Sequence, residues 1–443
     1  MIWETTNSKN SRYFLYLLFG VIAFYFNRFV DRTDFILLIS CYSSLFLLYG
    51  LLIKNIFSSK IASSEIIIAA VGIRLLLIGN IPNLSDDYYR FIWDGVVNTL
   101  HVNPFAFTPE FLLNQFNNSS RSEFLQTDIY ANLNSTEYYS IYPPVCQWIF
   151  TGVSYVAGNS IFLHVLLLKT CMVLFEAGSI VLLIRILRKL QLPISKAAYY
   201  AFNPLVIIEL TGNIHMEAMM IFFLLLSIYL LLNNFFLPAA IFLGISISVK
   251  LWPLMLLPLL FRRLEIRHAL KIIVIALLIV GISFLPYYKS GSILNYFTSF
   301  RLYFQTFEFN ASIYYALKWM FQNNYNYVIL IQRILPVILT ITILLIAFSK
   351  RIKLDFITLS LLVFTLYFLC STTIHPWYLT PLIALTSITI LRYSILWSFL
   401  ICFTYITYNY LPYQENLIIV AIEYLILYAV IMYEFFNLRK SIK

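Results

Sequence analysis

Long apolar runs recur along the whole chain and leave few folds open to it. Hydrophobic residues make up 61% of the 443 residues and charged residues only 11%, and the mean hydropathy is +0.83. A soluble protein carries roughly 25% charged residues. Backbone polar groups cannot stay unpaired in lipid, so runs that cross the hydrocarbon layer, which is roughly 30 Å thick, must be helices. The sequence predicts an all-α, polytopic transmembrane helical bundle that forms a single membrane-embedded domain over residues 1–443.

Short basic connectors separate many of these runs and orient the chain. Basic loops stay on the cytoplasmic side, and this pattern also accounts for the net charge of +10 without a nucleic-acid partner. Keeping the connectors on one side, with both termini there, requires about 11–14 spans, several of marginal length. The connectors lie at 54–60, 185–196, 262–271, 350–353 and 439–443.

Residues 82–144 then form a long first outer loop, which we expect to carry amphipathic helices. The apolar run that follows it, 145–157, is too short to span comfortably. We interpret this run as a re-entrant or interfacial helix on the outer face.

The outer loop opens with an acidic motif, LSDDYYRFIWDGVVNTLHVNPF, at 84–105. If the segment is helical, Asp86, Arg90 and Asp94 share one face. One interpretation is a surface helix with ion pairs worth roughly 0.2–0.5 kcal/mol each. The other is an active site in which Asp86 or Asp87 acts as general base at the membrane surface. The second carboxylate would then orient the acceptor or a metal, so a divalent metal stays open, although no cofactor is predicted.

Four later polar stretches also fall on the outer side of the predicted topology, and so does one arginine of an aromatic-rich loop. Ionisable groups at membrane depth are costly and usually functional. Their convergence predicts a substrate site at the outer rim of the bundle. The candidate substrate-binding residues are Arg90, Asp94, Tyr142, His215, Glu217, Lys250, Arg301, His375, Trp377 and Tyr378.

Each candidate also has a simpler explanation. Lys250 and Arg301 suit a lipid-linked phosphate, but a lysine at this depth also snorkels to the interface. His215 and Glu217 could bind sugar hydroxyls or phosphate, or they could cap a helix end. His375 can donate to phosphate or move a proton. Tyr142 precedes two prolines, which favour a turn over direct catalysis, and Trp377 with Tyr378 fits an interfacial helix start.

The motifs together resemble a known family. SDDYYRFIWDG followed by HVNPF resembles the first-outer-loop signature of polytopic glycosyltransferases with the GT-C fold, in particular the mannosyltransferases that use polyprenyl-phosphate mannose. IYPPVCQWIF resembles the proline-containing helix that follows in those proteins. GNIHMEAMM, VKLWPLMLLP and IHPWYLTP resemble their later motifs, in the same order, so the resemblance spans residues 80–381.

The resemblance implies a reaction. A sugar, here mannose, would pass from a polyprenyl-phosphate donor to a hydroxyl of a glycan or glycolipid acceptor, with inversion and with Asp86 or Asp87 as the base. Relatives often carry an acidic pair after the histidine where this chain has His215-Met216-Glu217, so the role of Glu217 stays open. We expect an integral, multi-pass protein of the bacterial inner membrane, in contact with membrane lipid, with its active site on the periplasmic side.

Two other classes stay open as alternatives. A transporter or flippase of lipid-linked sugars would share the aromatic residues and the cations, but it would more often show inverted repeats and ionisable residues near mid-membrane. A surface-polysaccharide ligase or polymerase would place its essential residues in a large late loop. In this chain the acidic motif comes early and the ionisable groups lie near the ends of the apolar runs.

Overall fold

Helices account for all the regular secondary structure of the described chain. The computed structural model describes residues 2–115, 119–289, 291–321, 324–410 and 412–442. One isolated parallel bridge in these ranges pairs Phe309 with Thr373. The predicted all-α class is therefore confirmed. The α-helices are α1 (Ile2–Phe29), α2 (Phe35–Phe57), α3 (Ser63–Leu75), α4 (Asp87–Thr99), α5 (Pro109–Leu113), α6 (Ser120–Phe124), α7 (Pro144–Ala157), α8 (Ile161–Lys189), α9 (Ala198–Ala201), α10 (Pro204–Val206), α11 (Glu217–Leu232), α12 (Phe236–Val249), α13 (Leu260–Arg263), α14 (Ile266–Phe284), α15 (Ser292–Thr306), α16 (Ile313–Met320), α17 (Tyr325–Phe348), α18 (Phe356–Cys370), α19 (Thr380–Thr386), α20 (Tyr393–Leu400) and α21 (Leu417–Ile442).

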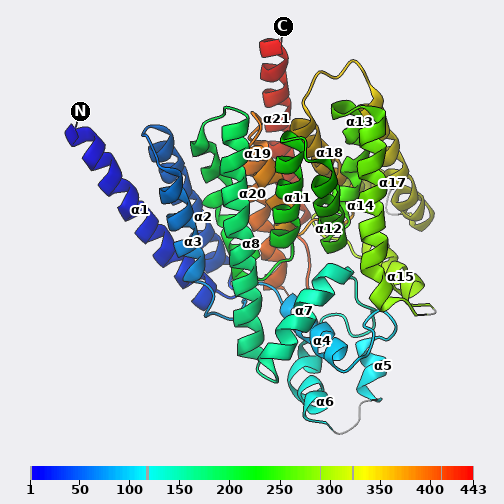
Figure 1. The fold of residues 1–443 in the computed structure, drawn as a ribbon. Helices are drawn as coiled ribbons and strands as arrows, with labels where there is room; N and C mark the ends of the chain where they lie inside the picture. The colour runs from blue at the N-terminus through cyan, green and yellow to red at the C-terminus, as the bar shows by residue number, and fades with distance from the viewer. Residues whose placement is uncertain (1, 116–118, 290, 322–323, 411, 443) are drawn as a thin grey trace.

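The molecule consists of an upright helical bundle with a smaller layer of helices at one end (Figure 1). The layer contains α4, α5, α6 and α7, and α15 lies beside it. Both chain termini lie at the opposite end of the bundle, as does the connector between α17 and α18. The predicted outer loop therefore folds as a separate layer at the end of the bundle away from the termini.

Five described helices are long and apolar enough to cross a membrane by themselves. They are α2, α8, α14 with its short 3-10 extension, α17 and α21, and a bent pair, Pro204–Gly212 with Glu217–Leu232, would make a sixth. These five or six helices of the described chain do not confirm the predicted number of about 11–14 spans. The chain is interrupted more often than its hydropathy suggests, because prolines and 3-10 or π turns break the apolar runs. Such turns occupy Ile194–Ala197, Ile207–Gly212, Trp252–Leu259, Pro376–Leu379 and Ile401–Asn409.

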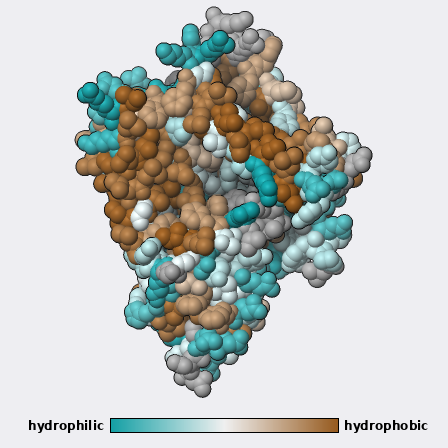
Figure 2. All heavy atoms as spheres, turned by 90° about the vertical axis from the view of Figure 1, so that its right-hand side faces the viewer, coloured by the Kyte–Doolittle hydropathy of each residue, from teal (hydrophilic) through white to brown (hydrophobic). Residues whose placement is uncertain are grey.

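The outer surface of the bundle is apolar where it would meet lipid. Large hydrophobic side chains of α14, α17 and α21 are exposed along the length of these helices. Figure 2 shows the result as a wide apolar surface over the bundle, with hydrophilic residues gathered toward both ends. An apolar exterior of this kind is stable only in a bilayer, so the protein is an integral membrane protein.

The interior of the bundle holds a buried ion pair. Arg74 of α3 bonds to Glu176 of α8, with 2.7 Å between Nε and Oε2, and both side chains are 0% exposed. Arg74 also donates to the carbonyl of Ala201 at 2.8 Å, and Thr211 donates to Glu176. The arginine that the sequence places inside an apolar run therefore ties three parts of the bundle together.

The outer layer depends on a close contact between α4 and α7, which pack against each other. A Cβ atom at Gly95 of α4 would overlap with the carbonyl of Phe150 and the hydroxyl of Ser154 on α7. Glycine is therefore required at this position by the approach of two helix backbones.

We expect Gly95→Ala to destabilise the protein by about 1–3 kcal/mol, because α4 must move away from α7. The free energy of unfolding in detergent, followed by denaturant titration, measures the effect. Gly152→Ala on α7 is the matched control, since open space surrounds that position. An equally small effect of both substitutions would contradict the close contact.

Candidate active site

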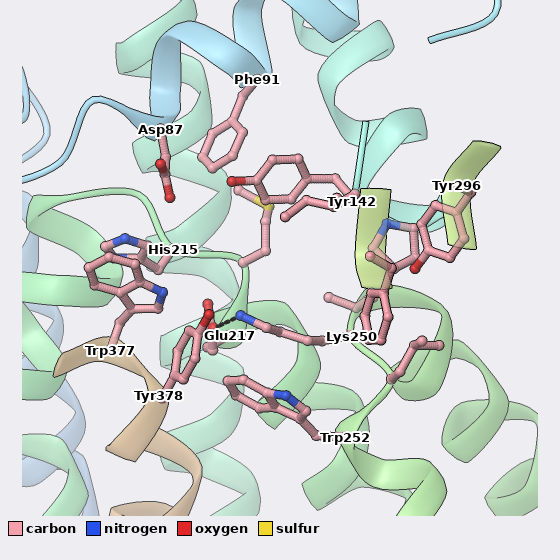
Figure 3. Close-up of a pocket in the computed structure, with 16 residues that line it drawn as sticks. Asp87, Phe91, Tyr142, His215, Glu217, Lys250, Trp252, Tyr296, Trp377 and Tyr378 are labelled. Carbon is pink, nitrogen blue, oxygen red and sulfur yellow. Dashed lines mark hydrogen bonds and ion pairs between the residues drawn. The ribbon is translucent and has the colours of Figure 1, made fainter. Parts of the chain in front are cut away.

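One cavity lies where the outer layer meets the bundle (Figure 3). Its volume is about 700 Å³, counting the space at its open mouth. Six segments that are distant in the sequence line it: the start of α4, the turn before α7, the break before α11, the end of α12, α15, and the turn after α18. The lining residues are Asp87, Phe91, Ile141, Tyr142, Pro143, His215, Met216, Glu217, Val249, Lys250, Leu251, Trp252, Tyr296, Phe300, Trp377 and Tyr378.

Most of the candidate residues from the sequence meet in this cavity. Those that line it are Asp87, Tyr142, His215, Glu217, Lys250, Trp377 and Tyr378. The remaining candidates, Asp86, Arg90, Asp94, Arg301 and His375, lie outside the lining. The expected gathering of polar clusters at one rim of the bundle therefore holds for the majority of them.

The two adjacent aspartates point to different places. Asp86 precedes α4, and its carboxylate is 39% exposed and bonds to Arg32 at 2.5 Å. Asp87 begins the helix and faces the cavity, where Asn134 Nδ2 donates to its Oδ1 at 3.2 Å and the Tyr142 hydroxyl points toward it (Figure 3). The structure thus separates the pair, and only Asp87 is placed to act in the cavity.

The cavity changes the acidity of Asp87. Burial raises the pKa of this carboxyl above its usual range, because desolvation penalises the charged form, while the bond from Asn134 and the charge of Lys250 oppose the rise. A carboxylate whose pKa is raised in this way is a better proton acceptor than an ordinary aspartate.

Arg90 and Asp94 form an ion pair inside the outer layer, with 2.8 Å between Nε and Oδ1. Arg90 also donates to the carbonyl of Ser135 at 2.8 Å, and Gln147 donates to Asp94 at 2.9 Å. The predicted pairing along the helix is therefore present, but Asp86 does not share its face, because this residue lies before the helix begins. The pair holds the layer together and does not reach the cavity.

Lys250 lies at the break between α12 and the following 3-10 turn. Its ammonium group bonds to Glu217 in the first turn of α11 and lies over the rings of Trp252 and Tyr378, at 4.1 and 4.5 Å from their centroids. The lysine side chain is 26% exposed and that of Glu217 is 2% exposed. Lys250 is therefore held inside the cavity by a counter-ion and two aromatic faces, and it does not snorkel to bulk water.

His215 lies in the break before α11 and stacks on Trp377, with 3.9 Å between the ring centroids and an interplanar angle of 12°. His375 stacks on the other face of Trp377, at 4.4 Å and 2°. The two histidines cover both faces of the indole, so neither face of Trp377 is open to a sugar ring. His375 supports the cavity wall from behind and does not line the cavity.

Arg301 is exposed and lies on α15 outside the lining of the cavity. The same helix contributes Tyr296 and Phe300 to the lining, and neither residue was among the candidates from the sequence. Their i, i+4 spacing in an aromatic-rich segment was the available signal. Phe105 of the HVNPF motif packs on Tyr296, with 5.5 Å between the ring centroids, and so connects the acidic motif to this wall.

Several other residues of the site were not among the candidates, although Met216, Val249 and Trp252 lie within the GNIHMEAMM and VKLWPLMLLP motifs. The ring of Trp252 lies against the ammonium group of Lys250, and Met216 and Val249 contribute apolar surface to the lining. Asn134, which bonds to Asp87, lies in an irregular part of the outer loop. Within the described ranges, no group of three or more His, Cys, Asp or Glu side chains is placed to share a metal ion.

Comparison with known proteins identifies the family. A family model described as alpha-(1->6)-mannopyranosyltransferase, N-terminal domain, of the MptA/B family, matches residues 35–264, just over half of the chain. The matched range includes Asp87, Tyr142, His215, Glu217 and Lys250 of the cavity. No curated protein and no solved structure matches the chain. The chain therefore belongs to the MptA/B family of alpha-(1->6)-mannopyranosyltransferases and is a membrane-embedded glycosyltransferase, a mannosyltransferase.

Proposed function

We propose that this enzyme takes mannose from a polyprenyl-phosphate donor and transfers it, with inversion, to a hydroxyl of a glycan or glycolipid acceptor. Asp87 is the general base, and the fold is of the GT-C type. The active site lies on the periplasmic side of a bacterial inner membrane. The observation that carries the proposal is the cavity itself, which combines a desolvated carboxylate and an anchored ammonium group at the junction of the outer layer and the apolar bundle.

The reaction needs few chemical groups. Asp87 accepts the proton of the acceptor hydroxyl while the oxygen attacks the anomeric carbon. The bond between that carbon and the phosphate oxygen breaks, and the phosphate leaves with the electron pair. Phosphate is a good leaving group, so positioning, a base and charge stabilisation are sufficient. An alpha-linked product formed by inversion requires a beta-linked donor.

The environment of the cavity suits a donor with a lipid tail. The apolar surfaces of α14 and α17 provide a path in the bilayer for an isoprenoid chain. On the face that carries these helices, Figure 2 shows a recess with polar residues between apolar surfaces. A donor in this position would keep its tail in lipid and bring its phosphate toward Lys250, which is a point charge suited to phosphate.

The proposal is tested with purified enzyme in nanodiscs, a short mannose oligosaccharide as acceptor, and two alternative donors. Polyprenyl-phosphate beta-mannose is expected to give an alpha-linked product, identified by the anomeric coupling in its NMR spectrum, whereas a nucleotide-linked mannose gives none. Transfer from the nucleotide donor alone, or a beta-linked product, would reject the proposed donor and stereochemistry.

Lys250→Met is expected to raise the KM for the lipid donor by at least tenfold, because the donor phosphate loses its cation and meets the carboxylate of Glu217 unpaired. Initial rates at several donor concentrations measure the change, with the KM for the acceptor as the internal reference.

A second variant separates two explanations of that result. Lys250→Met with Glu217→Gln removes both charges of the pair. If Lys250 contacts the phosphate, the double variant keeps a raised KM for the donor. Recovery of the wild-type KM in the double variant would mean that Lys250 only neutralises Glu217, and it would contradict the phosphate contact.

A further inference from the structure

His215 carries a polar atom that the structure leaves without a partner. The side chain is 2% exposed, and its Nε2 atom is buried and has no hydrogen bond. An unpaired buried polar atom is unfavourable unless a ligand or water supplies the missing partner. The residue lines the cavity, and Figure 3 shows its ring at the wall below Asp87.

The protonation pattern of this ring follows from its other nitrogen. His215 Nδ1 lies 2.8 Å from the backbone carbonyl oxygen of Glu209. A carbonyl oxygen can only accept, so Nδ1 carries the hydrogen and the Nε2 of the neutral ring is a bare acceptor. The carboxylate of Glu209 also lies 3.5 Å from Nδ1, but the ring is almost fully buried and shares the cavity with the cation Lys250. Desolvation therefore disfavours a second proton on His215.

The aromatic contacts fix the ring in this orientation. Stacking on Trp377 holds the plane of His215, and the bond to the Glu209 carbonyl fixes its rotation within that plane. The two histidines cover both faces of Trp377. The rings of Trp252 and Tyr378 are in contact with the ammonium group of Lys250. These rings are therefore poorly placed to stack on a sugar, which must be held largely by polar contacts.

A bare acceptor nitrogen selects what can bind next to it. Phosphate oxygens are acceptors, and they would repel the lone pair of Nε2, whereas a sugar hydroxyl can donate to it. In the proposed reaction the mannosyl ring must lie between the phosphate and the attacking oxygen, and therefore between Lys250 and Asp87. His215 borders this space in Figure 3.

We infer that Nε2 of His215 accepts a hydrogen bond from one hydroxyl of the donor's mannosyl unit, and that this contact sets the sugar preference of the enzyme. The inference rests on the proposed function and adds to it which end of the cavity holds the sugar. It predicts that the sugar lies at the His215 side and the phosphate at the Lys250 side.

A double-mutant cycle between protein and substrate tests the contact. The donors are polyprenyl-phosphate mannose and its monodeoxy analogues, each lacking one sugar hydroxyl, and the enzymes are wild type and His215→Phe. In wild type, loss of the hydroxyl that binds His215 is expected to lower kcat/KM by about tenfold to hundredfold. In His215→Phe the same deletion is expected to cost less than about threefold, while the other deletions keep their wild-type cost.

Two further variants make the result specific. His164→Phe is the matched control, because His164 is also buried but has both nitrogens bonded, to the Ser160 carbonyl at 2.8 Å and to the Ser154 hydroxyl at 3.1 Å. It is expected to show no coupling to any deoxy donor. His215→Gln retains an acceptor oxygen and is expected to keep part of the discrimination. His215→Leu has no hydrogen-bonding group and replaces His215→Phe in the cycle if the phenylalanine variant does not fold.

The outcomes separate this inference from the function on which it rests. If wild type transfers mannose but every deoxy donor loses the same factor in wild type and in the His215 variants, the hydroxyl contact is rejected and the proposed function stands. If wild type does not use the polyprenyl-phosphate donor, the proposed function fails and the inference falls with it.

Discussion

Replacing Asp87 by asparagine is expected to lower kcat about 10²- to 10⁴-fold, which is the usual contribution of a positioned general base. Asparagine preserves the shape and the bond with Asn134 but cannot take the acceptor proton. Asp86→Asn is the matched control. It is expected to change kcat only a few fold, because Asp86 pairs with Arg32 outside the cavity. Single-turnover rates with saturating donor and acceptor measure both effects.

The pH profile gives an independent check on the same residue. Asp87 must be deprotonated to act as a base, so the rate falls as the pH drops through its pKa. Burial raises that pKa, and the acidic limb of kcat/KM is therefore expected above the value of about 3.9 typical of a free aspartate. This limb should vanish in Asp87→Asn and persist in Asp86→Asn. Full turnover of Asp87→Asn, or an acidic limb unchanged by the substitution, would refute the assignment.

Arg74→Met is expected to cost about 3–5 kcal/mol of stability, because it leaves the carboxylate of Glu176 unpaired inside the bundle. The loss should appear as a lower midpoint of unfolding in detergent and as reduced yield from membranes. The double variant Arg74→Met with Glu176→Leu removes both charges and should recover most of the stability, because apolar replacement of a buried pair is often neutral. A single variant as stable as wild type would show that the pair does not hold the bundle together.

Helical spacing in the acidic motif predicted one of its side-chain contacts correctly and misplaced one residue. Helical spacing predicted the Arg90–Asp94 pair, which forms with 2.8 Å between its atoms. The same spacing assigned Asp86 to that helix face, but α4 begins at Asp87, so its neighbour turns toward Arg32. A side chain just before a helix start does not follow the spacing of the helix, and hydropathy and charge do not locate a helix start to one residue.

The number of membrane-spanning helices could not be predicted from hydropathy alone. Apolar composition indicated a polytopic helical protein, but it could not distinguish a continuous span from one broken by 3-10 or π turns, as at Ile207–Gly212 and Trp252–Leu259. These breaks free backbone groups and re-aim the side chains next to them, including His215 and Lys250. The interruptions that reduce the number of long helices are therefore also the features that build the cavity.

Hydropathy and charge along the sequence predicted an all-helical membrane protein whose polar motifs gather at one rim, and the sequence supplied the residue types present there. These properties follow from hydropathy and charge, which act residue by residue. Three features emerge from the packing of the folded chain alone. Asp87, not Asp86, faces the cavity, Glu217 neutralises Lys250, and two histidines enclose Trp377 while one nitrogen of His215 stays unpaired. Such contacts join residues distant in the chain, and they are set by how helices pack and where they break.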